Sequence, residues 1–219
     1  MSAKLWAEIG LGIYETFYMT LASTLLGYVI GLPLGVILII TRRDGIRQNL
    51  AVNQVLGVIV NIMRSIPVLI LMIAIIPFTR FVMGKSYGST ATIVPLTMAA
   101  FPFISRMVES SLAEVDGGVI EAAQAMGATP MQIIRKVYIP EATPSLISGA
   151  AIVATNILGY SAMAGSVGGG GLGAIAINYG YYRFNAEVMV VCIAIMVVLV
   201  QAMQLVGTRL SVQLDHRLR

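Results

Sequence analysis

The sequence has little charge and few side chains that bind metals. Only 11% of its 219 residues are Asp, Glu, Lys or Arg, whereas 58% are hydrophobic, and the mean hydropathy is +0.87. Soluble domains usually carry about 25% charged residues, so a soluble fold would lack a polar surface. The single cysteine, Cys192, excludes an internal disulfide, and the single histidine, His216, argues against a histidine metal site. The composition therefore predicts an integral membrane protein with several spans.

Long stretches without charge mark the expected spans. A helix needs about 20 mostly apolar residues to cross the hydrocarbon core of a bilayer. The stretches that are long enough lie at about 16–41, 50–79, 88–107, 145–163 and 187–208. The glycine-rich sequence after 163 is too polar for a further crossing, and we expect a loop there that dips back into the protein. The sequence thus predicts an all-α membrane protein with five transmembrane helices in a single domain, 1–219.

The distribution of Lys and Arg predicts the orientation of these spans, because both residues favour the cytoplasmic side. With the N-terminus outside and the C-terminus cytoplasmic, the inner side holds Arg42, Arg43, Arg47, Arg106, Arg135, Lys136, Arg209, Arg217 and Arg219. The outer side then holds fewer basic residues, namely Lys4, Arg80, Lys85 and Arg183. The topology therefore explains the net charge of +4. Because the basic residues are spread over several segments rather than gathered on one face, they argue against nucleic-acid binding.

One water-compatible stretch, about 113–144, is cytoplasmic in this topology. Asp116 is expected to cap a helix that stops at Gly127, since glycine readily ends a helix in the left-handed conformation. The Thr-Pro pair at 129–130 predicts a second helix start, and the pair at 143–144 predicts another at the entry to the fourth span. We therefore expect two short helices that fold against each other.

The first of these helices collects small and apolar residues on one side: Val119, Ala122, Ala123 and Met126. A face of small residues permits close approach by another surface. Residue chemistry alone leaves two interpretations open. The helix pair either covers the inner ends of the spans or docks a soluble partner.

The same stretch carries a spaced pattern that resembles the signature of ABC importer permeases. Glu121-Ala122-Ala123 is followed after three residues by Gly127, and after nine more by an apolar-any-apolar group and Pro140. RSIPVLIL at 64–71, IVPLTMAAFPFISRMVE at 93–109 and GYSAMAGSVGGGGLG at 159–173 are similar to methionine importer permeases. The similarity covers about 16–207.

This resemblance implies a type I ABC importer permease fold in a bacterial inner membrane. It implies that the segment 113–144 is a coupling segment, which docks on a separate ATPase subunit through Glu121, Ala122, Ala123, Met126, Gly127 and Pro140. The complex would contain two copies of this chain, two ATPase subunits and an external methionine-binding protein, often a lipoprotein, surrounded by lipid. The chain would be a transport subunit without a cofactor or enzymatic activity, and ATP and Mg²⁺ would bind the ATPase subunit. Alternating access would translocate L- and D-methionine.

Some residues in the expected spans are candidates for the translocation pathway or a gate: Arg64, Asn61, Asn156, Tyr160, Ser161 and Met163. A charged side chain in a span usually faces protein or water, so Arg64 either lines the pathway or anchors a helix beside a kink at Pro67. The two asparagines either form interhelical hydrogen bonds or line the pathway. Ser161 and Met163 form either an outer gate or ordinary small-residue packing.

Other functions explain the sequence less well. Met83–Ser86 has the Gly-Lys-Ser end of a phosphate-binding loop, but Thr79 stands where that loop requires glycine. No set of nucleophile, base and orienting group suggests an enzyme. A secondary transporter would need more spans, repeats and buried acidic groups, and no Asp or Glu is expected deep in a span. A membrane scaffold leaves the coupling signature unexplained, whereas a permease for glycine betaine or a polar amino acid remains the alternative.

Overall fold

The computed structural model describes residues 3–214, whose regular elements are helices and which include no strand. Four segments are long and apolar enough to span a membrane: α1 (Ala3–Thr41), α5 (Ser89–Ala113), Pro130–Val167, which contains α8 (Ile139–Ala164), and α10 (Ala186–Leu214). A fifth crossing exists if α2 (Leu50–Ser65) and α3 (Val68–Ala74) count as one span. The predicted all-α membrane fold is therefore confirmed, and a bent pair of helices stands at the second predicted span.

The stretch predicted as one span at 50–79 is divided into pieces. The helices α2 and α3 meet at an angle of 99°, and α4 (Ile76–Met83) follows. Pro67 explains the break, because it lacks an N–H and disfavours helical geometry in the residue before it. Ile66 accordingly has an extended backbone with ψ 125°. The expected kink is thus a complete interruption of the helix.

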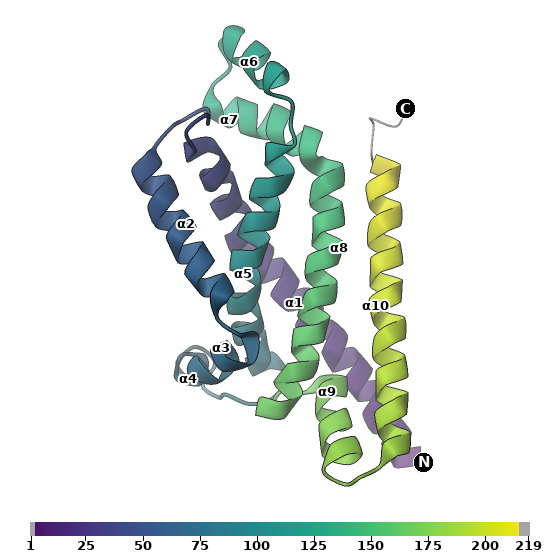
Figure 1. The fold of residues 1–219 in the computed structure, drawn as a ribbon. Coiled ribbons are helices and arrows are strands. Elements are labelled where there is room, and N and C mark those ends of the chain that lie inside the picture. Colours follow the sequence, from purple (N-terminus) through teal and green to yellow (C-terminus); the bar gives the residue numbers. More distant parts are fainter. Residues whose placement is uncertain (1–2, 215–219) are drawn as a thin grey trace.

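The helices α1 and α5 cross in the centre of the molecule (Figure 1). Gly27, Gly31 and Gly35 follow one face of α1 at four-residue spacing, and all three are buried. A methyl group at Gly31 would lie 2.8 Å from the Cβ of Ile104 on α5. Small residues let two backbones approach closely, and dispersion between closely packed helices stabilises them in lipid. This contact builds the core to which the other helices attach.

At one end of the molecule, α6 (Gly117–Ala125) and α7 (Pro130–Ile133) extend beyond the spans (Figure 1). The helix start predicted at 143–144 is wrong, because α7 continues through a π-helical turn, η1 (Ile134–Tyr138), directly into α8. Thr143 lies inside α8 and donates its hydroxyl to the carbonyl of Ile139 at 2.8 Å. Pro140 cannot donate to the carbonyl of residue 136, which explains why the helix widens there.

The glycine-rich sequence after α8 dips back into the protein as expected, but as short helices rather than a loop. These are η2 (Gly165–Val167), α9 (Gly171–Ile175) and η3 (Ala176–Tyr181). Leu172 and Ala176 form a core with Ile9 of α1 and with Val188 and Cys192 of α10. Cys192 is therefore a buried apolar residue within a span.

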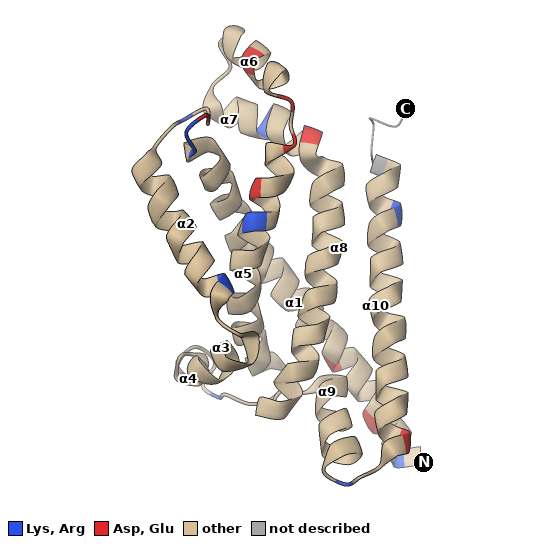
Figure 2. Ribbon diagram, in the orientation of Figure 1, with Lys and Arg blue, Asp and Glu red and all other residues tan. Residues whose placement is uncertain are grey.

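Charged residues gather at the two ends of the molecule, with a few more on α2 and α5 between them (Figure 2). The start of α1 and the end of α10 lie at opposite ends (Figure 1). The end with α6 and α7 is the one where α1 and α10 finish. His216, Arg217 and Arg219 lie outside the described residues.

Candidate coupling segment and translocation pathway

Local sequence signals shape α6. The Asp116 carboxylate accepts a hydrogen bond from the N–H of Gly118 at 2.6 Å, so the predicted N-cap is present. At the other end Gly127 has φ +81°, a left-handed conformation that favours glycine. The turn is closed by the N–H of Ala128, which donates to the carbonyl of Ala123 at 3.0 Å. The predicted helix and its stop therefore both occur.

The helix α7 begins with a reciprocal cap. The hydroxyl of Thr129 accepts from the N–H of Gln132 at 3.4 Å, while the Gln132 side chain accepts from the N–H of Thr129 at 2.8 Å. Pro130 occupies the first turn, where a missing N–H has no cost. These contacts fix the corner between α6 and α7, as the Thr-Pro pair predicts.

The two helices are held together by a small apolar core. Ala123 is buried with Ile133 and Tyr138 in the same cluster as residues of α1, α5 and α8. The remaining residues of the predicted small face are exposed, with Val119 45% and Met126 82% accessible. The coupling segment is thus anchored through Ala123 and leaves an apolar surface uncovered.

The other signature residues lie on the outside of this segment. Glu121 and Ala122 are exposed on α6, and Pro140 is exposed near the start of α8. The chain itself leaves Glu121 and Ala122 uncovered. A carboxylate and a small side chain side by side offer an ionic contact and close approach.

A cavity of about 240 Å³ lies between α2, α3, α5 and α8. It brings together two of the predicted pathway residues, Arg64 and Tyr160. The guanidinium carbon of Arg64 lies 5.9 Å from the centre of the Phe103 ring, which is within the range of a cation–π contact. This pathway cavity is the site where candidate residues from separate spans converge.

A polar cluster next to the cavity joins α2 to α5. Arg106 donates to the Asn61 side chain at 2.9 Å and to the carbonyl of Gly57 at 3.1 Å. Its other guanidinium nitrogen pairs with Glu109 at 2.6 Å. Asn61 therefore forms an interhelical hydrogen bond, which is one of the two roles expected for it from the sequence. Charge-assisted hydrogen bonds of this kind are stronger than neutral ones.

The other candidate pathway residues lie outside the cavity. Asn156 is half-buried and makes no side-chain hydrogen bond to any residue in the range 3–214. Ser161 is buried and donates to the carbonyl of Leu158 at 2.7 Å, whereas Met163 is 50% exposed. Two residues along a helix point about 200° apart, so Ser161 and Met163 face different sides of α8. The geometry does not bring them together as one gate.

At the opposite end of the molecule, α1 holds the glycine-rich segment. The Glu15 carboxylate accepts from the N–H of Gly171 at 2.7 Å and from the hydroxyl of Ser89 at 3.4 Å. The hydroxyl of Thr16 accepts from the N–H of Leu172 at 2.9 Å. Gly171 has φ +80°, and a methyl group there would lie 2.6 Å from the Thr16 hydroxyl. Residues of α1 therefore cap α9.

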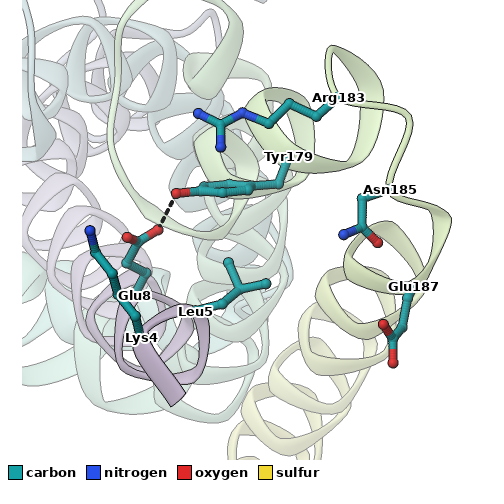
Figure 3. A pocket seen from close by; sticks show the side chains of 7 residues that line it. All are labelled: Lys4, Leu5, Glu8, Tyr179, Arg183, Asn185 and Glu187. Carbon is teal, nitrogen blue, oxygen red and sulfur yellow. Dashed lines mark hydrogen bonds between the residues drawn. The ribbon is translucent and has the colours of Figure 1, made fainter. Parts of the chain in front are cut away.

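A second cavity, of about 510 Å³, opens beside the start of α1 and is lined by Lys4, Leu5, Glu8, Tyr179, Arg183, Asn185 and Glu187 (Figure 3). The Tyr179 hydroxyl donates to Glu8 at 2.6 Å, and Arg183 lies over the Tyr179 ring at 4.4 Å. The hydrogen bond to the Glu8 carboxylate, with some desolvation, raises the pKa of Tyr179. The hydrogen bond between Tyr179 and Glu8 ties η3 to α1.

Sequence reasoning missed Glu15, Phe103 and Arg106. Glu15 lies within α1 because the helix begins at Ala3, well before the uncharged run at 16–41, so an acidic group does enter this long helix. The pair Arg106 and Glu109, three positions apart at the end of a predicted span, was the signal that could have revealed the polar cluster. No local pattern marks Phe103 as a partner of Arg64.

Known proteins are similar to this chain over nearly its whole length. Residues 19–219 match the family described as binding-protein-dependent transport system inner membrane component. A probable D-methionine transport system permease protein MetI of Vibrio cholerae is 50% identical over 204 residues, covering 93% of this chain and 91% of that protein. A protein of the same description from Pasteurella multocida is 46% identical over 217 residues, covering 99% and 100%.

Solved structures share the fold. A chain of the MetNI methionine ABC transporter in inward facing conformations matches with a TM-score of 0.97 and 48% identity, covering 99% of this chain and 100% of that chain. A chain of an amino acid ABC transporter matches with a TM-score of 0.79 and 19% identity, covering 96% and 95%. The predicted importer permease fold and the resemblance are thereby confirmed. The chain belongs to the inner membrane components of binding-protein-dependent transport systems and is a transport subunit.

Proposed function

We propose that this chain is the permease subunit of an ABC importer for methionine, of both the L and the D form. The observation that carries the proposal is the likeness of the whole chain to the MetNI permease, with a TM-score of 0.97 at 48% identity. The relatives from Vibrio cholerae and Pasteurella multocida, described as D-methionine permeases, support the same substrate. Permeases for glycine betaine or polar amino acids have no comparable support.

The coupling segment is the proposed contact with a separate ATPase subunit. Its exposed residues Glu121, Ala122 and Met126 would enter a cleft on that subunit, while the buried Ala123 keeps the segment attached to the spans. ATP and Mg²⁺ would bind the ATPase subunit. Closure of two ATPase subunits would move the coupling segments of two permease copies.

Movement of the coupling segment would reach the pathway through α8. The segment from Pro130 to Val167 is one continuous helical stretch, and it carries Tyr160 into the pathway cavity. A displacement of α7 therefore shifts the wall of the cavity without passing through a loop. Met163, which is half-exposed near the far end of α8, is a candidate gate residue, and Asn156 is a candidate pathway residue.

The proposed orientation places α6 and α7 in the cytoplasm and the start of α1 outside, in a bacterial inner membrane. The external methionine-binding protein would then meet the end of the molecule that carries α9 and the cavity of Figure 3. Lys4, Arg183 and the exposed rings of Tyr181 and Phe184 offer charged and aromatic contacts there. Lipid would cover the exposed apolar faces of α1 and α10.

The test is uptake of labelled methionine by proteoliposomes that contain this permease, its ATPase subunit and its binding protein. We expect uptake that needs internal ATP and is inhibited by both L- and D-methionine. Inhibition by glycine betaine or histidine instead would assign the alternative substrate class. Uptake without ATP would indicate a secondary transporter and refute the proposal.

The docking surface is tested with two matched substitutions at exposed alanines. Ala122→Trp places a bulky ring on the proposed contact and should abolish copurification of the ATPase subunit. Ala186→Trp makes the same change at the start of α10, at the opposite end of the molecule, and should leave copurification intact. Equal copurification of both variants would show that α6 does not contact the ATPase subunit.

A further inference from the structure

Arg64 forms no ion pair with an Asp or Glu side chain among residues 3–214. It lies in the last turn of α2, where the helix dipole favours positive charge. The ion pairs between side chains of residues 3–214 join Arg42 to Asp44 and Arg106 to Glu109. The Phe103 ring is the contact made by the Arg64 guanidinium. A cation at membrane depth is costly, and such residues face the bundle interior or a water-filled cavity and mark substrate or ion pathways.

The position of Arg64 along α2 argues against a lipid headgroup as that partner. The rise of about 1.5 Å per residue places Arg64 about 21 Å from Leu50, where α2 begins. The hydrocarbon core is about 30 Å thick, so Arg64 lies deep within it if α2 starts near one surface. Figure 1 shows α2 ending partway between the two ends of the molecule. Phosphate groups at the membrane surface near the start of α2 are therefore remote.

The cavity beside Arg64 suits a small, partly apolar ligand. Its volume of about 240 Å³ is below the 300–1,000 Å³ of pockets for drug-sized molecules. Met63, Leu71 and Phe103 provide apolar walls, and Tyr160 faces the cavity from α8. Sulfur and aromatic rings attract each other, so Phe103 and Tyr160 suit a thioether side chain.

We propose that the pathway cavity is a binding site for the transported amino acid within the membrane. The carboxylate of the amino acid binds the Arg64 guanidinium, whose planar fork matches two carboxylate oxygens. The apolar side chain of the amino acid lies against Phe103 and Leu71. This inference rests on the proposed function, and it adds a site of substrate recognition in the permease itself.

The position of Tyr160 gives this site a connection to the coupling segment. Arg64 belongs to α2, whereas Tyr160 belongs to the continuous segment that begins at α7. Movement of that segment changes the distance between Tyr160 and the Arg64 cation. The cavity can therefore hold the amino acid in one state of the transporter and release it in the other.

Photolabelling with a diazirine analogue of methionine tests the site. The probe is applied to the permease and ATPase complex in lipid nanodiscs, without binding protein, and labelled residues are located by mass spectrometry. We expect labels on 63–71, 99–103 or Tyr160. Excess methionine should suppress them at least tenfold, whereas methioninamide, which lacks the carboxylate, should not. Equal suppression by both compounds would show that no carboxylate is recognised and would overturn the proposal.

Substitution of Arg64 provides the second arm. Arg64→Met should lower cavity labelling at least tenfold, and Arg64→Lys, which keeps the charge, should retain part of it. Arg80→Met removes an arginine from the last turn of α4, outside the cavity, and should label as the parent protein does. Unchanged labelling of Arg64→Met would refute the site. If Arg64→Met does not assemble, Arg64→Lys and the methioninamide comparison still decide.

Uptake assays separate this inference from the proposed function. Failure of the parent complex to take up methionine with its binding protein would refute the proposed substrate. Uptake by the parent complex without labelling in the cavity would refute only the membrane binding site. Loss of uptake in Arg64→Met, with stimulation of ATP hydrolysis by loaded binding protein preserved, would support the site.

Discussion

At Gly127 the backbone has φ +81°, and a side chain there would meet no other atom within 4 Å. The cost of Gly127→Ala therefore comes from the left-handed backbone, which is about 1–2 kcal/mol for a residue with a Cβ. Gly117 has equally open space but no positive φ, so Gly117→Ala is the matched control. We expect Gly127→Ala to reduce ATP-driven uptake and ATPase copurification while Gly117→Ala leaves both unchanged. Similar behaviour of the two variants would show that the turn geometry is unimportant.

Glu15 is a second residue whose role is testable by itself. Glu15→Ala removes the acceptor for the Gly171 N–H and the Ser89 hydroxyl, which are then left without this partner. Loss of a hydrogen bond to a charged group costs about 1.5–3 kcal/mol. We expect a lower thermal unfolding temperature of the purified permease, with most of the loss restored in Glu15→Gln, which keeps one acceptor oxygen. An unchanged unfolding temperature in Glu15→Ala would contradict the capping role.

At the scale of elements, hydrogen bonds join α2 to the neighbouring helices α1 and α5. Val60 is the one buried residue of α2, and Arg106 supplies its hydrogen bonds to α5. Arg106→Gln should loosen α2. The cysteine introduced by Val60→Cys should therefore react faster with maleimide when Arg106→Gln is also present than when Arg106 is retained. Arg135→Gln removes an exposed arginine of η1 and serves as the control. Equal reaction rates would mean that apolar packing holds α2.

The elements also show which features a single sequence can predict. The caps at Asp116 and Thr129 and the stop at Gly127 involve neighbours within a few positions, and all were predicted correctly. The contact between Glu15 and Gly171 joins residues 156 positions apart, and no local pattern specifies it. The helix start predicted at 143–144 failed because the helix begins earlier and continues through Pro144, which lies inside α8. Local chemistry was therefore visible in the sequence, and contacts between spans were not.

At the scale of the whole molecule, the orientation in the membrane is open to direct measurement. The buried Cys192 should react little, and Cys192→Ala removes it altogether. In that background we expect Arg183→Cys to react with an impermeant maleimide added to intact cells whose outer membrane has been permeabilised. Met131→Cys, which is exposed on α7, should react only after the inner membrane is opened. The reverse pattern would invert the proposed topology.

The π turn η1 determines the direction in which the residues after it point around the helix axis. It lies between the docking helices and α8, and a π turn contains one residue more than the α-helical turn it replaces. Deleting one residue from 134–138 would rotate everything after it by about 100°. Hydropathy, spans and signature residues would remain, yet Tyr160 would point away from Arg64. The five residues of η1 therefore set the angle between the coupling segment and α8. A chimaera that exchanges coupling segments must preserve their number, so that Tyr160 still points toward Arg64.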